Sequence, residues 1–274
     1  MQKVFTKNIF NEAEVGEIRN YLKDFLKADK REHYKAEQGE HYYVSIESIK
    51  QNQLLWNFIF NKKVLEFIKK SFNEKIYFYN NIVIQKNNLR FNKKLWYHKD
   101  SGDFHQSEIL KKKENELSKV GLYLQKNIKG KGGGIDILKP FKYDNFSENN
   151  KFINKFRGLF YRLQNIFSNT HLYSEAGDVV IFNALINHRT SLTKEKYKGH
   201  TEDKYVIYLQ FINYNLIKDT LKIIDKEKRY KNDTDIEEQM INYNSSNIEF
   251  KVLNKNFTDL ISQYLGAAQK PMLN

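Results

Sequence analysis

Two histidines and one aspartate have the residue types and spacing of a set of metal ligands. His98 and Asp100 are separated by a single lysine. In an extended chain, residues i and i+2 project from the same face, so both side chains can reach one ion. His188 lies far along the chain, beyond an apolar run that is typical of a buried strand. The sequence therefore predicts one metal ion held by His98, Asp100 and His188.

The turn before this apolar run supports the placement of His188. Gly177 and Asp178 form a tight-turn pair that leads directly into Val179–Phe182. His188 then follows the strand, where a β-sandwich opens at one end. The alternative ligands are His105, His171 and His200, with Asp103 as an alternative carboxylate. Of the two carboxylates, Asp100 fits the His-x-Asp register better.

The ligand set narrows the choice of metal without deciding it. Two histidines and one carboxylate on one face of an octahedral iron leave three positions open, which suits oxygen activation. Zinc with three protein ligands and one water is the alternative. The chain has no cysteine, so a metal has to be held by His, Asp or Glu.

The middle of the chain has the pattern of an antiparallel sandwich or barrel. Short runs rich in β-branched and aromatic residues alternate with Gly, Asn and Asp clusters, as in jelly rolls. The predicted strands are Ile76–Tyr79, Ile82–Gln85, Val120–Gln125, Ile135–Leu138, Val179–Phe182 and Tyr205–Phe211. We expect this β-rich core to span residues 75–215.

Helical patterns precede, interrupt and follow the core. Asn11 and Glu14 form a capping-box pattern before the first apolar-periodic stretch, and Ile49–Phe72 has the same periodicity. A helical insert is expected at 146–169, either as a lid or as a buttress, and a helical extension at 216–274. With a helical part at 1–74, the sequence predicts one domain over residues 1–274.

Composition excludes several classes of protein. Hydrophobic residues make up 40% of the 274 residues, enough for a large core. The first residues carry acids within their apolar stretch, unlike a signal peptide, and no apolar run approaches 18 residues. We therefore expect a cytoplasmic protein without membrane segments. The net charge of +13 comes mostly from lysine rather than arginine, which disfavours a nucleic-acid partner.

Four pieces, in this order, resemble one known family, the phytanoyl-CoA dioxygenase-like branch of the 2-oxoglutarate/Fe(II) oxygenases. They are Trp96–Asp100, Val120–Gln125, the Gly132–Pro140 stretch, and Ala176–Phe182 leading to His188-Arg-Thr-Ser. The resemblance covers about half of the chain, from Tyr77 to Tyr214. It implies a double-stranded β-helix, a jelly-roll-like fold with flanking helices, and Fe(II) as the metal.

The resemblance also implies 2-oxoglutarate as co-substrate, chelating iron through its 1-carboxylate and 2-keto oxygens. In the family an arginine that opens the strand after the distal histidine usually holds the other carboxylate. Here that position is Lys204, which offers a charge without the bidentate fork. Lys198 and then Arg189 are the alternatives, although Arg189 should point away from the site. Fe²⁺, Asp100 and the co-substrate sum to −1, so one lysine neutralises the site.

Three further residues are expected to donate hydrogen bonds to the co-substrate: Tyr123, Gln125 and Thr190. Core packing is the alternative role for each. Basic residues around the helical insert favour an anionic substrate, such as one linked to phosphate, CoA or a nucleotide.

The predicted function is a 2-oxoglutarate-dependent dioxygenase that uses O₂ to hydroxylate an unactivated C–H of a small or carrier-linked metabolite. Succinate and CO₂ are released. The carboxylate ligand favours hydroxylation, because halogenating relatives replace it with a small residue. The alternatives are a β-sandwich protein that binds nucleic acid or another polyanion without catalysis, and a zinc-dependent hydrolase. The hydrolase lacks an obvious glutamate base beside the ligands.

Overall fold

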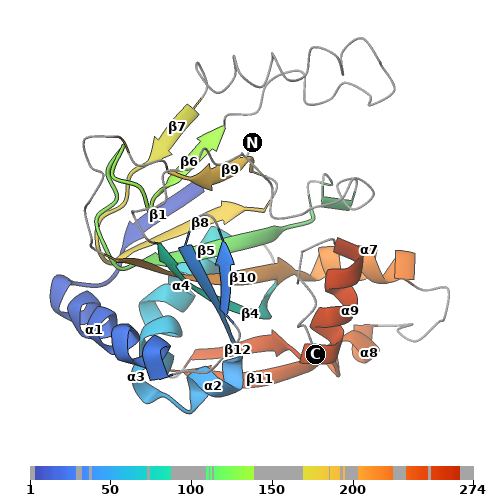
Figure 1. The fold of residues 1–274 in the computed structure, drawn as a ribbon. Coiled ribbons are helices and arrows are strands. Elements are labelled where there is room, and N and C mark those ends of the chain that lie inside the picture. Colours follow the sequence, from blue (N-terminus) through green and yellow to red (C-terminus); the bar gives the residue numbers. More distant parts are fainter. Residues whose placement is uncertain are drawn as a thin grey trace, which may run out of the picture.

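Two β-sheets and a layer of helices make up the fold (Figure 1). The structure is a computed structural model, and it describes residues 4–28, 33–36, 39–72, 75–87, 109–110, 112, 114–138, 169–184, 186–191, 194, 203–224, 233–245 and 248–265. The small sheet has the order β7 (Asn169–Leu172), β6 (Ile135–Leu138), β9 (His188–Thr190). It lies above the large sheet in Figure 1.

The large sheet carries the remaining described strands. Its order is β1 (Val4–Asn8), β8 (Asp178–Asn183), β5 (Leu117–Tyr123), β10 (Lys204–Asn213), β4 (Ile76–Asn87), β12 (Ile248–Leu253), β11 (Met240–Ser245). A further strand, β3 (Gly39–Val44), pairs with β4, and β2 (His33–Ala36) pairs with β3.

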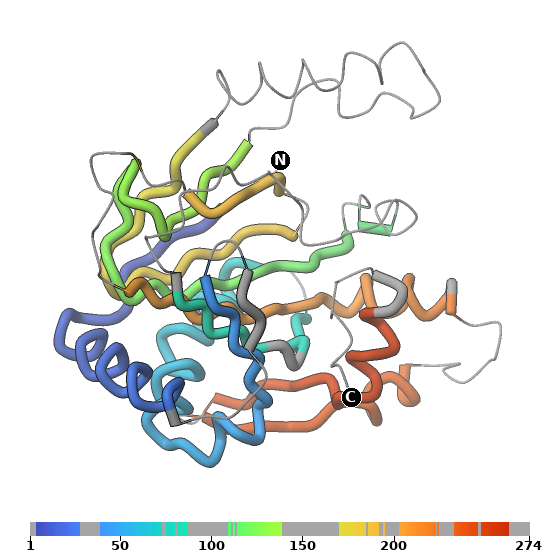
Figure 2. Tube along the Cα trace, viewed as in Figure 1, coloured from blue at the N-terminus to red at the C-terminus, as the bar shows by residue number. Residues whose placement is uncertain are grey.

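The path of the chain between the sheets is that of a jelly roll. From β5 it passes to β6 and β7 in the small sheet, to β8 in the large one, to β9 in the small one, and back to β10, as Figure 2 shows. All strand pairs among these six are antiparallel. This confirms the predicted double-stranded β-helix.

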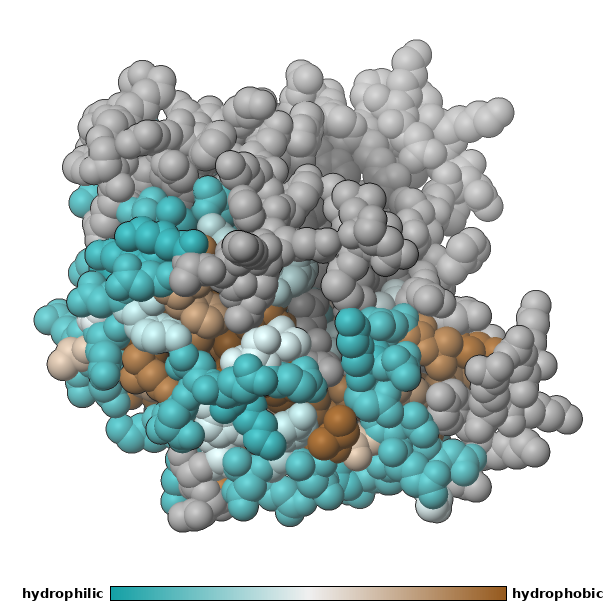
Figure 3. Space-filling view, turned by 60° about the horizontal axis from the view of Figure 1, so that its bottom comes forward, coloured by the Kyte–Doolittle hydropathy of each residue, from teal (hydrophilic) through white to brown (hydrophobic). Residues whose placement is uncertain are grey.

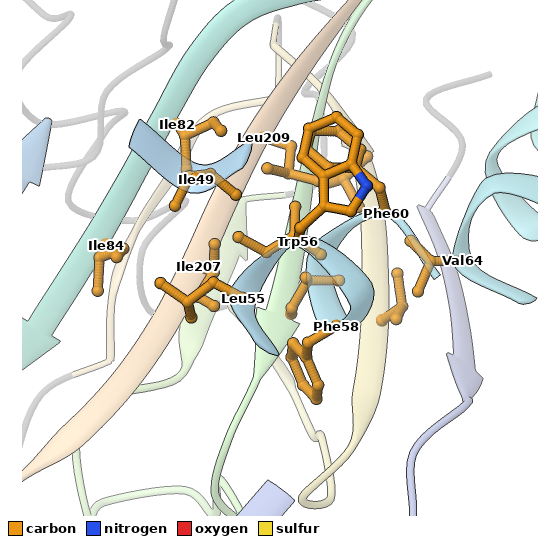
Figure 4. Close-up of a cluster of buried hydrophobic side chains, with 14 of the residues drawn as sticks. Ile49, Leu55, Trp56, Phe58, Phe60, Val64, Ile82, Ile84, Ile207 and Leu209 are labelled. Atoms are coloured by element: carbon orange, nitrogen blue, oxygen red, sulfur yellow. The ribbon is translucent and has the colours of Figure 1, made fainter. Parts of the chain in front are cut away.

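The outer face of the large sheet is covered by helices α1 (Glu12–Ala28), α2 (Ile46–Lys50), α3 (Gln53–Ile59) and α4 (Lys62–Ser71). The predicted capping box begins α1: the Asn11 N–H donates to a Glu14 carboxylate oxygen at 2.8 Å, and the Glu14 N–H donates to Asn11 Oδ1 at 3.0 Å. In Figure 4, Ile207 and Leu209 lie with Leu55, Trp56 and Phe58 in this core.

Strand β10 is buried along its whole length because both of its faces are covered. Ile207 and Leu209 belong to the outer core against the helices. The alternate residues Val206 and Tyr208 belong to a second cluster, which fills the space between the two sheets. Residues of β10 with even numbers therefore face the interior of the β-helix.

Both flanking parts contain strands that the sequence did not predict. The part at 1–74 is helical as expected in α1 to α4, but it also forms β1, β2 and β3. The part after 216 contains α7 (Tyr214–Ile224), α8 (Asp233–Glu237) and α9 (Lys255–Leu265), but also the hairpin β11–β12. A purely helical assignment was wrong there, because Phe250 and Val252 alternate into the core that α3 and α4 also cover.

Other expectations differ in their boundaries or fall outside the described residues. The two predicted strands Ile76–Tyr79 and Ile82–Gln85 are one strand, β4, whose pairing with β10 shifts register between Leu209 and Phe211. The predicted helical insert at 146–169 is not among the described residues, apart from Asn169, which begins β7.

No helix within the described ranges is both long and apolar enough to cross a membrane. Figure 3 shows one face of the molecule, on which the described surface is largely hydrophilic with small apolar areas between.

Gly177 is expected to tolerate no side chain, and this prediction concerns stability. Its φ is +89°, and a Cβ there would lie 2.1 Å from the carbonyl oxygen of Phe10. That oxygen belongs to backbone that cannot move away cheaply, because Ile9 and Phe10 both donate to the Gly177 carbonyl. We expect Gly177→Ala to lower the free energy of unfolding by more than about 2 kcal/mol. Urea denaturation measures it, with Gly16→Ala as control, where a Cβ meets nothing within 4 Å.

Candidate metal and co-substrate site

His188 is the one predicted metal ligand that the structure describes. It is the first residue of β9, and its side chain is buried, with the residue 5% exposed. Its Nδ1 lies 2.9 Å from the carbonyl oxygen of Ile186. A carbonyl oxygen only accepts, so Nδ1 carries a proton, and in the neutral imidazole the lone pair is then on Nε2. Metal-ligating histidines are held in this way, with one nitrogen anchored and the other available to the metal.

The ring of His188 faces the interior of the β-helix. It contacts the ring of Phe182 edge-on, with 5.0 Å between centroids. Phe182 belongs to the interior cluster, together with Ile186. The predicted ligand therefore points into the space between the sheets.

His98 and Asp100 lie outside the described residues, so their place as ligands stays a prediction. Within the described ranges no group of three His, Asp or Glu side chains is arranged to hold a metal. The segment that carries His98 and Asp100 leaves β4 at Asn87, and Asn87 pairs with Lys204 of β10. Lys198 is likewise not among the described residues.

Lys204 is the first residue of β10 and is only 4% exposed. Lys204 and Val206 are two residues apart on β10, so the Lys204 side chain faces the interior as Val206 does. Its Nζ donates to the carbonyl oxygen of Gly132 at 2.7 Å. Gly133 has φ +75°, and a Cβ there would lie 2.3 Å from Lys204 Cδ. The turn before β6 is thus shaped around the lysine side chain.

Thr190 lies between His188 and this turn. It pairs with Ile135 on β6, while His188 pairs with Ile137. Two residues of a strand span about 6.6 Å. The Gly132–Gly134 turn directly precedes Ile135. A short, extended molecule bound at His188 would therefore run along Thr190 toward Lys204.

Tyr123 and Tyr208 form the middle of the interior face. Their hydroxyl oxygens are 3.3 Å apart, and both rings lie against Gly121, where a Cβ would come within 3.0 Å of each. Burial raises the pKa of Tyr123, and the neighbouring Tyr208 raises this pKa further. Tyr123 is therefore a neutral phenol, which can donate a hydrogen bond.

Gln125 has a structural role at the end of β5. Its side-chain oxygen accepts from the backbone N–H of Tyr205 at 2.7 Å, and its amide nitrogen donates to Asn127 at 3.4 Å. The side chain thus extends the pairing of β5 with β10 beyond the last residue of β5. It holds the residue next to Lys204 in place.

Arg189 points away from the interior, as strand alternation predicts. On the outer face of the small sheet its Nε donates to Asp136 Oδ2 at 3.3 Å. Asp136 Oδ1 also accepts from Ser191 Oγ at 2.8 Å and from His171 Nδ1 at 2.9 Å. One buried carboxylate therefore links β6, β7 and the segment around β9. His171, an alternative ligand in the sequence, belongs to this cluster and not to the interior.

Asp136 is expected to stabilise the small sheet in a pH-dependent way. Burial raises its pKa, but the hydrogen bonds from His171 and Ser191 and the charge of Arg189 outweigh burial and lower the pKa. The stabilisation is therefore complete above the unfolded pKa of about 3.9 and is lost as the pH falls below it. We expect Asp136→Asn to lower the free energy of unfolding by about 2 kcal/mol at pH 7, and by less at pH 3.5. Urea denaturation at both pH values checks it, and an equal loss at both would contradict it.

A cavity of about 480 Å³ lies elsewhere, between α4 and the β11–β12 hairpin. Its lining includes Leu65, Ile68, Phe78, Phe211 and Phe250. Phe78 and Phe211 belong to the outer core, so this cavity is separated from His188 by the large sheet.

Two residues near the site escaped the sequence reasoning. Gly133 was noted only as part of a glycine-rich stretch, and Tyr208 only as part of a strand. A signal existed for Gly133, since a run of three glycines before a strand indicates close approach of another group. None existed for Tyr208, because its contact with Tyr123 depends on the pairing of β5 with β10.

No protein-family model matches the chain, and a comparison with curated proteins finds no match. Solved structures are similar in fold. HygX from Streptomyces hygroscopicus, with nickel and 2-oxoglutarate bound, matches with a TM-score of 0.55 and 12% identity over 78% of this chain and 84% of that one. The same protein has been solved with hygromycin B bound as well.

Two enzymes of nogalamycin biosynthesis match similarly. The non-haem α-ketoglutarate-dependent carbocyclase SnoK has a TM-score of 0.54 and 12% identity over 77% of this chain and 80% of its own. The epimerase SnoN, in complex with Fe³⁺, α-ketoglutarate and nogalamycin RO, has a TM-score of 0.52 and 11% identity over 77% and 79%. The resemblance to the phytanoyl-CoA dioxygenase-like oxygenases is thus confirmed for the fold: this chain has the double-stranded β-helix of non-haem, 2-oxoglutarate-dependent enzymes.

Proposed function

We propose that the protein is a 2-oxoglutarate-dependent, non-haem Fe(II) enzyme, with His98, Asp100 and His188 as the metal ligands. The observation that carries the proposal is the geometry of His188. It is buried inside the β-helix, and its Nδ1 is anchored on Ile186, so that Nε2 is the ligating nitrogen. Two imidazoles and one carboxylate are a donor set that suits Fe(II) and leaves positions open for a co-substrate and O₂.

In this proposal the co-substrate extends from the metal to Lys204, whose side chain is packed against Gly133. Lys204 would hold the distal carboxylate, and Thr190 lies along the path from His188. Tyr123 stays protonated and would donate a hydrogen bond to the same molecule. Gln125 positions the strand that begins at Lys204 instead of touching the co-substrate.

The charges are consistent with this assignment. Fe²⁺, the Asp100 carboxylate and doubly negative 2-oxoglutarate sum to −1. Lys204 brings the sum to zero, which limits the free energy of burying these groups. When bound, iron and 2-oxoglutarate would activate O₂, which is the oxidant, and the protein supplies orientation and a dry interior.

We further propose that the reaction is hydroxylation of an unactivated C–H, with release of succinate and CO₂. The carboxylate of Asp100 as third ligand favours this outcome over halogenation. Neighbours of the same fold include an epimerase and a carbocyclase, so the fold alone leaves the reaction open. The substrate class is a small or carrier-linked metabolite, as supported by neighbours that bind hygromycin B or nogalamycin RO. The whole chain acts as one oxygenase domain in this proposal.

An anaerobic titration tests the proposal directly. Fe(II) and then 2-oxoglutarate are added to the metal-free protein, and the weak visible charge-transfer band of the chelate is followed. The band should appear only with both additions and should be absent in Asp100→Ala. A wild-type protein that binds neither would favour the zinc or polyanion alternatives, and salt-sensitive binding to a polynucleotide would identify the latter.

A further inference from the structure

The interior face of the large sheet carries a second polar layer, apart from Lys204. It consists of Lys119 on β5 and Gln210 on β10, which pair directly across the two strands. Gln210 is buried and Lys119 half-buried. On one side of this layer lies the interior apolar cluster that contains Tyr208 and Phe182. On the other side lies the cluster of Leu117 and Ile212, which packs against α7 and α9.

Two neighbours of Lys119, Phe182 and Tyr208, place it close to the proposed metal ligand. It pairs with Phe182 on β8, and the ring of Phe182 contacts the ring of His188. Its Nζ lies 4.6 Å from the centroid of the Tyr208 ring, a cation–π contact on the interior face. Lys119 is therefore a cation one aromatic ring away from His188.

This layer is too far from Lys204 to serve the same molecule. Gln210 and Lys204 are six residues apart on β10, about 20 Å along the strand. That length far exceeds the five-carbon chain of 2-oxoglutarate. If Lys204 holds the distal carboxylate, Lys119 lies at the other end of the interior, where a substrate has to approach the metal.

We propose that Lys119, with Gln210 beside it, binds an anionic oxygen group of the substrate, either a carboxylate or a phosphate. This inference rests on the proposed function and names the substrate class for the same site. A cation on the interior face attracts an anion strongly because the surrounding clusters are apolar. The rings of Phe182 and Tyr208 provide apolar surface for the carbon skeleton, and Gln210 supplies an amide donor next to the ammonium.

The test uses small probes, since the substrate itself is unknown. Benzoate and phenyl phosphate are titrated into the full-length protein by calorimetry, with benzyl alcohol as the uncharged counterpart. Each titration is done on the metal-free protein and after loading with Fe(II) and saturating 2-oxoglutarate. The variants are Lys119→Met, which removes the charge, and Lys119→Arg, which keeps it. Lys126→Met is the matched control, an exposed lysine that pairs with Glu175.

We expect one or both anions to bind, and benzyl alcohol to bind at least about tenfold more weakly. Lys119→Met should weaken anion binding by a similar factor, whereas Lys119→Arg and Lys126→Met should retain it. Whichever of benzoate and phenyl phosphate binds more tightly shows whether the site prefers a carboxylate or a phosphate. Equal binding in Lys119→Met, no saturable binding of either anion to wild type, or displacement of the probe by 2-oxoglutarate would overturn the inference.

Failure of the proposed function would be recognised separately. It would appear as an absent charge-transfer band in the wild type, while the titrations on metal-free protein would still measure the role of Lys119. A thermal melt shows whether each variant folds. If Lys119→Met does not fold, Lys119→Arg takes its place, and its ratio of benzoate affinity to benzyl alcohol affinity is compared with that of the wild type.

Discussion

Replacing His188 with alanine is expected to remove iron-dependent succinate release almost completely. The anchored Nδ1 leaves Nε2 as the ligating atom, and the ring lies against Phe182 in the interior. Loss of an outer-sphere partner of a metal ligand costs about 10- to 100-fold, so loss of the ligand itself should exceed about 100-fold. Succinate formation and the charge-transfer band of the Fe(II) complex should vanish together. We expect the same result for His98→Ala and Asp100→Ala.

His171→Ala is the matched control for this prediction. His171 is also buried, but it belongs to the Asp136 cluster on the outer face of the small sheet. The substitution should lower stability and leave the iron chelate detectable. Wild-type turnover in His188→Ala, or loss of the band in a folded His171→Ala protein, would show that the ligand assignment is wrong.

Replacing Lys204 with methionine is expected to weaken 2-oxoglutarate binding by at least about 30-fold, because one partner of a buried charge pair is removed. The effect should appear in KM for 2-oxoglutarate, and turnover should recover in part at high co-substrate concentration. Steady-state succinate formation over a range of 2-oxoglutarate concentrations measures it. Iron binding without 2-oxoglutarate should stay as in the wild type.

Two further variants make the Lys204 prediction specific. Lys194→Met removes an exposed lysine that lies against Gly130, in the segment before the same turn, and should leave KM unchanged. Gly133→Ala keeps Lys204 but places a methyl group on its side chain, so it should raise KM as well. An unchanged KM in Lys204→Met would transfer the role to Lys198.

The proposed site contains two lysines with different surroundings, and this separates their roles. The side chain of Lys204 is closely enclosed by the glycine turn before β6, so it suits an invariant co-substrate. Lys119 is half-buried and flanked by rings and an amide, so it suits a larger molecule. Variation of the substrate among enzymes of this fold should then follow residues at the Lys119 position more than at Lys204.

The fold class and most strands of the β-helix could be predicted from the amino-acid pattern alone. The short β-branched runs match β5, β6, β8 and β10, because strands buried on both faces need continuous apolar residues. The capping box before α1 could also be predicted from the sequence, since it depends only on two residues that are three positions apart. The His-x-Asp pair and His188 were also proposed from the sequence, and their role as ligands stays a prediction.

Which polar side chains face the interior, and which groups they contact, depends on strand pairing and could not be predicted from the sequence. The short strands β1, β3 and β9 form because distant partners supply their hydrogen bonds, so no local pattern marks them. Three features depend on the register between strands that are far apart in sequence. Lys204 faces the interior whereas Arg189 faces Asp136 on the outside, the Tyr205 N–H donates to Gln125, and the Lys119 ammonium lies over the ring of Tyr208. Register is set by which faces are buried, and a shift of one residue would exchange the interior and exterior sets.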